Sequence, residues 1–103
     1  MAYMFNEDKT KAEIKNLAVN VTRNVSTSVS YYYLYTNLDV ANVTVLGVTG
    51  IIIDRQGVVL RGFEVKENPD NTNKLALFIY IDNISNATVN SVKFTGNITY
   101  VES

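Results

Sequence analysis

The chain has 103 residues, which is the usual size of one domain and too short for two independent cores. Nine Lys and Arg against ten Asp and Glu leave a net charge of −1, so charge does not predict a nucleic-acid partner or an acidic membrane. The chain contains neither Cys nor His, which excludes disulfides, thiol catalysis, His-based triads and His-ligated metals. We therefore predict no metal site and no cofactor.

Residues 7–17 carry the only helical signal. Asn6 can cap a helix, acidic residues follow it, and lysines stand nearer the other end, as the helix dipole favours. Ile14 and Leu17 belong to one narrow apolar stripe. We therefore predict a short N-terminal helix within an arm of residues 1–17, which needs a surface to lie against because so short a helix is marginal alone.

Residues 19–35 alternate strictly between apolar and polar side chains, which predicts β-strand. The apolar set is Val19, Val21, Val25, Val29, Tyr31, Tyr33 and Tyr35, and the polar set is Asn20, Thr22, Asn24, Ser26, Ser28 and Ser30. Seventeen residues would make an unusually long strand, so we expect a break near Arg23 and Asn24. The second half, with Tyr32 and Leu34 apolar as well, is expected to be better buried.

Two extended segments, residues 42–53 and residues 58–66, flank the sequence Asp54-Arg55-Gln56-Gly57. Asp at the start and Gly at the end fit a type I turn that closes on a left-handed Gly57. We therefore predict a β-hairpin here.

Residues 67–73 are polar and contain the only proline of the chain, which predicts a loop. Residues 75–81 are almost continuously apolar and fit a central strand of a sheet. Residues 88–94 and residues 97–101 are predicted as the last strands, separated by Thr95 and Gly96.

The expected total is six or seven strands in about eighty residues, joined by short connections. This predicts an all-β domain over residues 18–103, an antiparallel immunoglobulin-like or jelly-roll-like sandwich, although a small barrel would give the same pattern. No repeat of fixed period and no low-complexity segment is present.

The most unusual local feature is the run Tyr31-Tyr32-Tyr33-Leu34-Tyr35. In a strand, Tyr31, Tyr33 and Tyr35 share one face and Tyr32 lies on the other. Such a row could be an aromatic platform for a carbohydrate or the centre of a protein interface, since Tyr buries a large area and keeps a polar tip. Ordinary core and cross-strand packing is the plainer explanation of the run, because aromatic residues are common in strands.

Two further patterns have plain structural explanations. Six Asn-x-Ser/Thr sites occur, at Asn20, Asn24, Asn42, Asn83, Asn86 and Asn97. Several would be glycosylation acceptors in a secreted chain, but alternating Asn and Thr on exposed strand faces and turns is the plainer explanation, and we favour it. Carboxylates are the only remaining catalytic candidates, and those in predicted loops are Asp39, Asp54, Asp70 and Asp82. None forms a calcium-loop motif, and each fits a turn, so we predict that the protein is not an enzyme.

The segment from Phe5 to Ile14, followed by a Ser- and Thr-rich β-domain, resembles the starts of small uncharacterised proteins from the tail and baseplate regions of phages and prophages of Gram-positive bacteria. The resemblance implies a virion component. It agrees with an N-terminus that lacks the pattern of a signal peptide, from which we expect synthesis in the cytoplasm.

We therefore expect a structural or assembly module that binds protein partners or itself, as a homo-oligomer, without nucleic acid or membrane insertion. Its interface is predicted at Tyr31, Tyr32, Tyr33, Tyr35, Ile14 and Leu17. A carbohydrate- or ligand-binding module that uses exposed tyrosines is the alternative.

Overall fold

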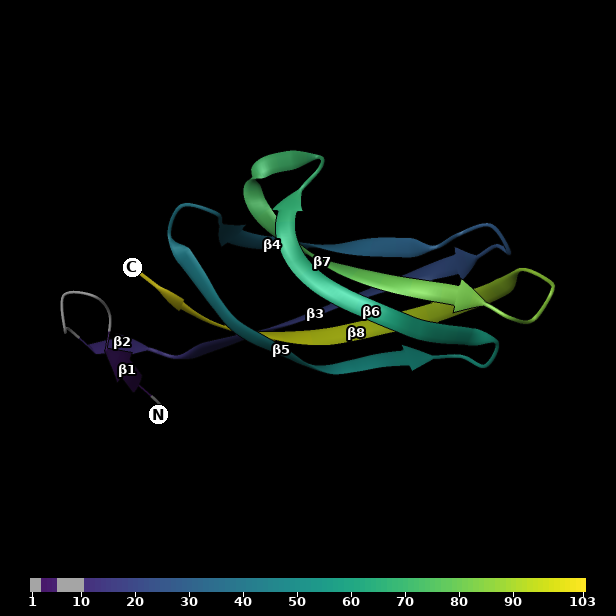
Figure 1. Cartoon of the computed structure of the whole chain (residues 1–103), viewed down its shortest axis with the longest axis horizontal. Coiled ribbons are helices and arrows are strands. Elements are labelled where there is room, and N and C mark those ends of the chain that lie inside the picture. The colour runs from purple at the N-terminus through teal and green to yellow at the C-terminus, as the bar shows by residue number, and fades with distance from the viewer. Residues whose placement is uncertain (1–2, 6–10) are drawn as a thin grey trace.

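The computed structural model describes residues 3–5 and 11–103, with side chains from Glu13 onward. The described residues form the strands β1 (Tyr3–Phe5), β2 (Lys11–Glu13), β3 (Lys15–Val25), β4 (Tyr31–Asp39), β5 (Val43–Asp54), β6 (Val58–Asn68), β7 (Asn71–Asn83) and β8 (Val89–Glu102). Strands β1 and β2 form a small hairpin, which lies at the same end of the molecule as the C-terminus (Figure 1). No helix in this part of the chain is long and apolar enough to cross a membrane.

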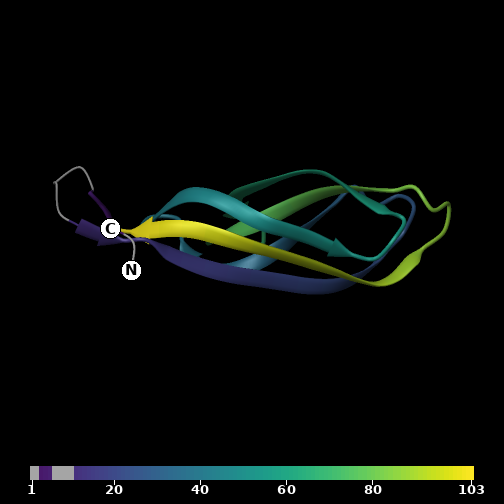
Figure 2. The same ribbon diagram turned by 90° about the horizontal axis from the view of Figure 1, so that it is seen from below.

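The other six strands form two open antiparallel sheets of three strands, in the orders β3-β8-β5 and β4-β7-β6. The chain passes to the other sheet at every connection except the tight β6–β7 hairpin. Figure 2 shows the resulting elongated, flattened body, whose extents are 53 × 27 × 18 Å. The predicted all-β architecture is confirmed, in the form of two facing sheets and not of a closed barrel.

The core lies between the two sheets and draws on both. Its largest fully buried side chains are Phe94, Leu34, Leu77, Ile79, Ile98, Val25 and Val92. The apolar run at residues 75–81 is confirmed as a central strand, β7. The equally central β8 is continuous through Gly96, where a break between two strands was predicted. An ideal Cβ built on Gly96 would lie only 2.6 Å from Cδ2 of Leu77. The absence of a side chain at Gly96 therefore allows the two central strands to approach closely.

The predicted helix over residues 7–17 is wrong for its described part. Residues 11–13 and 15–17 are strand, whereas residues 6–10 lie outside the described part of the chain. Period-two alternation extends back to Lys15, because Asn16 is exposed and Leu17 is half-buried against the core. Pairing of Lys15 with Tyr100 in β8 therefore overrides a weak helical propensity.

The predicted hairpin between residues 42–53 and 58–66 is also wrong. The turn itself is present, and Gly57 has the expected positive φ of 91°. However, β5 pairs with β8 and β6 pairs with β7, so the turn carries the chain from one sheet to the other. The predicted loop at residues 67–73 is instead a tight turn at Pro69 and Asp70, with Asn68 paired with Asn71.

The predicted break in residues 19–35 is confirmed and is larger than expected. A bulge lies between Arg23 and Val25, and residues 26–30 form the connection from β3 to β4. This connection changes which residues face inward: Val25 is fully buried, but Tyr31, predicted on the same face, is 45% exposed.

Candidate binding face

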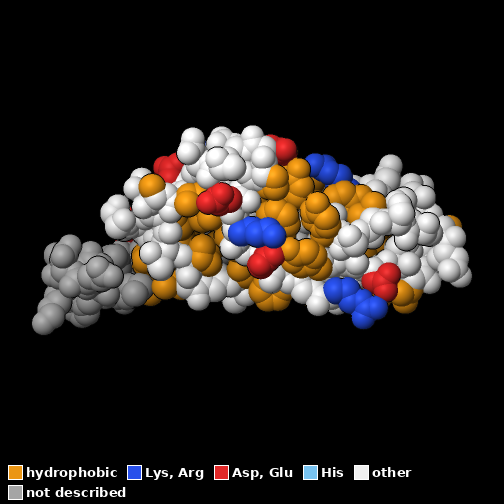
Figure 3. All heavy atoms as spheres, turned by 45° about the horizontal axis from the view of Figure 1, so that its top comes forward, with side chains coloured by type: hydrophobic (Ala, Val, Ile, Leu, Met, Phe, Trp, Pro, Cys, Tyr) orange, Lys and Arg blue, Asp and Glu red, His pale blue; other side chains and the backbone are white. Residues whose placement is uncertain are grey.

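The outer face of the sheet β4-β7-β6 carries five aromatic side chains, which we call the aromatic face. They are Tyr31, Tyr33 and Tyr35 on β4 and Phe78 and Tyr80 on β7. Tyr31 is paired with Tyr80 and Tyr33 with Phe78, so all five side chains point away from the core. Figure 3 shows hydrophobic side chains gathered over the middle of the surface, with only a few charged groups among them.

The rings of the aromatic face overlap one another. Tyr33 lies with its centroid 5.1 Å from that of Phe78 and 5.8 Å from that of Tyr35, with planes 23° and 29° from parallel. Tyr31 also stacks on Phe78, at 5.9 Å. Although it lies on an outer face, Phe78 is only 4% exposed, because these rings and Lys66, whose Nζ stands 4.4 Å from its ring centroid, cover it.

One carboxylate fixes the tyrosine hydroxyls at the β4 edge. The hydroxyl of Tyr33 donates to Oδ2 of Asp70 at 3.1 Å, and the hydroxyl of Tyr35 donates to the same oxygen. Asp70 is held in the β6–β7 turn, where its backbone N–H donates to Oδ1 of the buried Asn68 at 2.9 Å. The hydrogen bonds to Asp70 raise the pKa of Tyr33 and of Tyr35 above their ordinary value.

A second polar group borders the face on β6. The hydroxyl of Tyr80 donates to Oε1 of Glu64, and Nζ of Lys66 lies 3.0 Å from the same oxygen. The hydrogen bond from Tyr80 lowers the pKa of Glu64, and the bond to Glu64 raises the pKa of Tyr80. Lys66 thus neutralises Glu64 and covers Phe78 at the same time. The aromatic rings are therefore held in place by their neighbours on three strands.

The structure brings together only part of the predicted interface. Tyr31 and Tyr35 are 45% and 62% exposed, and Tyr33 is half-buried between them. Tyr32 points inward, with its ring 5.5 Å from that of Phe94 and its hydroxyl donating to the carbonyl of Asn24 at 2.7 Å. Leu17 is half-buried on β3 in the other sheet, and Ile14, also half-buried, lies between β2 and β3.

Sequence reasoning missed Phe78, Tyr80 and Asp70 as members of the face. Phe78 and Tyr80 were placed only in a central strand, and Asp70 only in a loop. Alternation along residues 75–81 could have put Phe78 and Tyr80 on one side of that strand. Only the register with β4 brings them beside the tyrosines, and sequence does not give that register.

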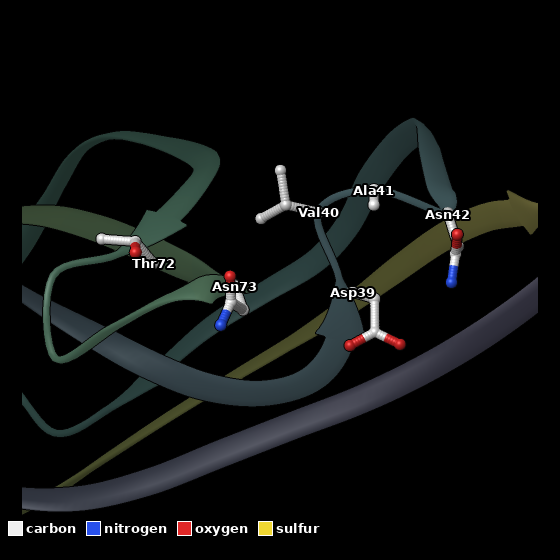
Figure 4. A pocket seen from close by; sticks show the side chains of 6 residues that line it. All are labelled: Asp39, Val40, Ala41, Asn42, Thr72 and Asn73. Carbon is white, nitrogen blue, oxygen red and sulfur yellow. The ribbon is translucent and has the colours of Figure 1, made fainter.

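A shallow pocket of about 360 Å³ lies at the end of β4. Figure 4 shows its six lining side chains, which come from the end of β4, the β4–β5 connection and the start of β7: Asp39, Val40, Ala41, Asn42, Thr72 and Asn73. Its one carboxylate, Asp39, is paired with Lys74. The pocket offers neutral polar and small apolar groups beside an ion pair that is already formed.

Two of the other three candidate carboxylates, Asp70 and Asp82, have structural partners as well. Asp82 pairs with Arg61 at 2.8 Å, and Asp70 accepts the two tyrosine hydroxyls. In residues 13–103, whose side chains are described, no three Asp or Glu side chains gather as a metal site would require.

A scan against models of protein families finds no match to this chain, and searches of curated proteins and of solved structures find no similar protein.

Proposed function

We propose that the protein is a non-enzymatic structural or assembly module whose aromatic face binds a neighbouring protein subunit. The observation that carries the proposal is the exposure of Tyr31 and Tyr35 at the two ends of a stacked, hydrogen-bonded row. Tyr is enriched at protein interfaces because it buries a large area and loses few side-chain rotamers on binding. Here the loss is smaller still, since neighbouring rings and Asp70 already hold the row.

The geometry supports a protein partner better than a carbohydrate. A sugar ring stacks on the open face of an aromatic side chain, but Tyr33 and Phe78 turn their faces to each other at 5.1 Å. Lys66 covers Phe78 from β6. A surface of ring edges and hydroxyl groups, bordered by Asp70 and Glu64, suits instead a partner with apolar groups and hydrogen-bond donors.

We further infer that the sandwich is of the jelly-roll type. This inference is supported by the strand orders β3-β8-β5 and β4-β7-β6, in which successive strands wind from sheet to sheet and the hairpin β6–β7 closes the winding. Jelly rolls occur in viral capsid and lectin domains. Together with the resemblance of residues 5–14 to phage tail and baseplate proteins, the topology supports a role as a virion component.

The aromatic face is tested by static light scattering over a range of concentrations. The wild type is compared with a Tyr31→Ser, Tyr35→Ser double variant and with Ile84→Ser, a matched control at a side chain that is 63% exposed on the β7–β8 connection. Circular dichroism confirms that each variant is folded. We expect the double variant to weaken self-association at least about tenfold and the control to leave it unchanged.

Retention of the wild-type mass by the double variant would refute self-association through this face. If the wild type remains a monomer at every concentration, its partner is not a second copy. A glycan screen with the same variants then tests the alternative. Binding of a carbohydrate that the tyrosine double variant loses would replace the proposed function.

A further inference from the structure

Two tyrosine–carboxylate groups border the aromatic face, one on β6 and one at the β6–β7 turn. In the first, which we call the Glu64 group, the hydroxyl of Tyr80 donates to Oε1 of Glu64. In the second, which we call the Asp70 group, the hydroxyls of Tyr33 and Tyr35 donate to Oδ2 of Asp70. The same chemistry, a carboxylate held by phenol hydroxyls, thus occurs twice beside one row of rings.

The Glu64 group contains its own cation. Nζ of Lys66 lies 3.0 Å from Oε1 of Glu64, and it donates to the hydroxyl oxygen of Tyr80 at 3.4 Å. The same Nζ stands 4.4 Å from the ring centroid of Phe78. One ammonium group therefore neutralises a carboxylate and covers an aromatic ring at once, because the ring face and the carboxylate both attract a cation.

The Asp70 group has no such cation among residues 13–103, whose side chains are described. Four ion pairs form among these residues, and none includes Asp70: Lys15 with Glu102, Arg61 with Asp82, Lys66 with Glu64, and Lys74 with Asp39. Within the same residues Oδ1 of Asp70 accepts no hydrogen bond, although an ionised carboxylate can accept at both oxygens. The described surface therefore presents an uncompensated charge and one available oxygen at Asp70.

Arg23 of β3 is the cation of this chain that acts on the Asp70 group from a distance. The hydrogen bond to Asp70 has the largest effect on Tyr35 and raises its pKa, whereas the charge of Arg23 lowers that pKa. The guanidinium of Arg23 nevertheless donates to the carbonyl of Thr22 at 3.0 Å and forms no ion pair with Asp70. Arg23 therefore does not fill the place that Lys66 fills in the Glu64 group.

This uncompensated charge matters if a partner covers the aromatic face. Tyr35, whose hydroxyl is bonded to Asp70, is the most exposed ring of the face, at 62%. A partner that packs on this ring also takes the carboxylate of Asp70 out of water. Removing a charge from water without an opposite charge beside it is unfavourable, and interfaces avoid it by matching charges across the contact. The partner must therefore bring a cation to Asp70.

Arginine fits this position better than lysine does. Tyr35 is the last ring of the row, with one face turned to Tyr33 at 5.8 Å, so its other face is open to a stacked group. A guanidinium is planar and weakly hydrated, stacks on aromatic rings, and donates several N–H bonds to one carboxylate. A single arginine can thus use the ring and the carboxylate together, as Lys66 does with Phe78 and Glu64.

We propose that the aromatic face binds its partner through an arginine that stacks on Tyr35 and donates to Oδ1 of Asp70. This inference rests on the proposed function, because it names the group that a partner subunit brings to the same face. It adds a requirement that the rings alone do not impose. The surface of the partner is basic where it meets Asp70, and increasing salt weakens the contact.

An arginine peptide is the direct probe of this contact. An acetylated and amidated tripeptide with a central arginine is titrated into isotope-labelled protein at low ionic strength and followed by NMR. The reference is the same peptide with citrulline, which keeps the shape of arginine without its charge. We expect the arginine peptide to shift the backbone N–H signal of Asp70 and the ring signals of Tyr35, and to bind at least about threefold more tightly than the citrulline peptide.

Two matched variants locate the cation. Asp70→Asn keeps an oxygen that accepts the tyrosine hydroxyls but removes the charge, and Asp82→Asn removes the same charge where Arg61 already compensates it. We expect Asp70→Asn to reduce binding of the arginine peptide to that of the citrulline peptide, and Asp82→Asn to change it less than about twofold. Equal binding of the two peptides by the wild type, or unchanged binding by a folded Asp70→Asn variant, would overturn the proposal.

Light scattering separates this inference from the proposed function. We expect both Asp70→Asn and the Tyr31→Ser, Tyr35→Ser double variant to weaken an association that uses the aromatic face. If the tyrosine double variant weakens it and Asp70→Asn does not, the face remains an interface and the arginine contact is refuted. If neither variant changes it, self-association through the face is refuted, and the peptide titration alone decides the arginine contact.

Discussion

Gly96→Ala tests whether the two central strands are held at the distance that this fold requires. An ideal Cβ on Gly96 would lie 2.6 Å from Cδ2 of Leu77 and 3.0 Å from Cδ1 of Ile51. Carbon atoms prefer separations of about 3.5–4.0 Å, so the sheets must move apart or Leu77 must leave its rotamer. Leu77 is fully buried, and protein interiors contain few voids that could take a displaced side chain. Overpacking of this kind costs about 1–3 kcal/mol, and the lower entropy of the unfolded alanine chain returns about 0.4–1 kcal/mol.

We therefore expect Gly96→Ala to lose about 1–2 kcal/mol of unfolding free energy, which lowers Tm by about 4–8 °C per kcal/mol in a domain of this size. Urea denaturation followed by circular dichroism measures the loss. Gly62→Ala is the matched control, since nothing lies within 4 Å of its Cβ position.

The clash also predicts that the effects of substitutions at Gly96 and Leu77 on the free energy of unfolding are coupled. Leu77→Val removes the Cδ2 atom, so Gly96→Ala should cost about 1 kcal/mol less in that background. A Gly96→Ala variant as stable as the wild type, or a loss that Leu77→Val leaves unchanged, would refute the close approach.

Three further predictions concern the face and the turns. Asp70→Ala should lower the pKa values of Tyr33 and Tyr35, as measured by ultraviolet absorbance. Because their pKa values are raised in the folded state, their contribution to stability is present below about pH 10 and is lost as pH rises through the raised values, so variant and wild type should converge in alkaline solution. Asn83→Ala should cost about 1–3 kcal/mol, because its amide donates to two carbonyl groups and its oxygen accepts two hydrogen bonds; chemical denaturation measures this. Gly57→Ala should destabilise by about 1–2 kcal/mol in a thermal melt, since φ is +91°.

Much of the fold could be predicted because local pattern and strand structure agree. Alternation over residues 19–25 predicted a strand with one apolar and one polar face, and the apolar run at 75–81 predicted a central strand; both strands are present. The turn at Gly57 was recognised because only a few residue types adopt its backbone conformation. Such features depend on neighbours in sequence, which a sequence displays directly.

Strand pairing was less accessible, because it depends on residues far apart in the chain. The turn between Asp54 and Val58 looks like that of a hairpin, yet the strands it joins pair with β8 and β7. A short turn is compatible with a hairpin and with a crossing from one sheet to the other. The apolar rows of the central strands β7 and β8 decide between the two, because β5 pairs with β8 and β6 pairs with β7. Gly96 was read as a strand break for the same reason: its role is to approach Leu77, nineteen positions away.

The candidate site shows how a small local feature decides what a surface contains. Had β3 and β4 formed one strand, Tyr31, Tyr33 and Tyr35 would have continued the inward row of Val25. The connection at residues 26–30 changes the phase, so Leu34 enters the core and the tyrosines turn outward onto Phe78. Stacking alone could hold the exposed rings. Asp70, which lies in the separate β6–β7 turn, also fixes the hydroxyl groups of two tyrosines. The proposed interface therefore rests on rings whose outward direction is set by the connection at residues 26–30 and whose positions are fixed by the turn that holds Asp70.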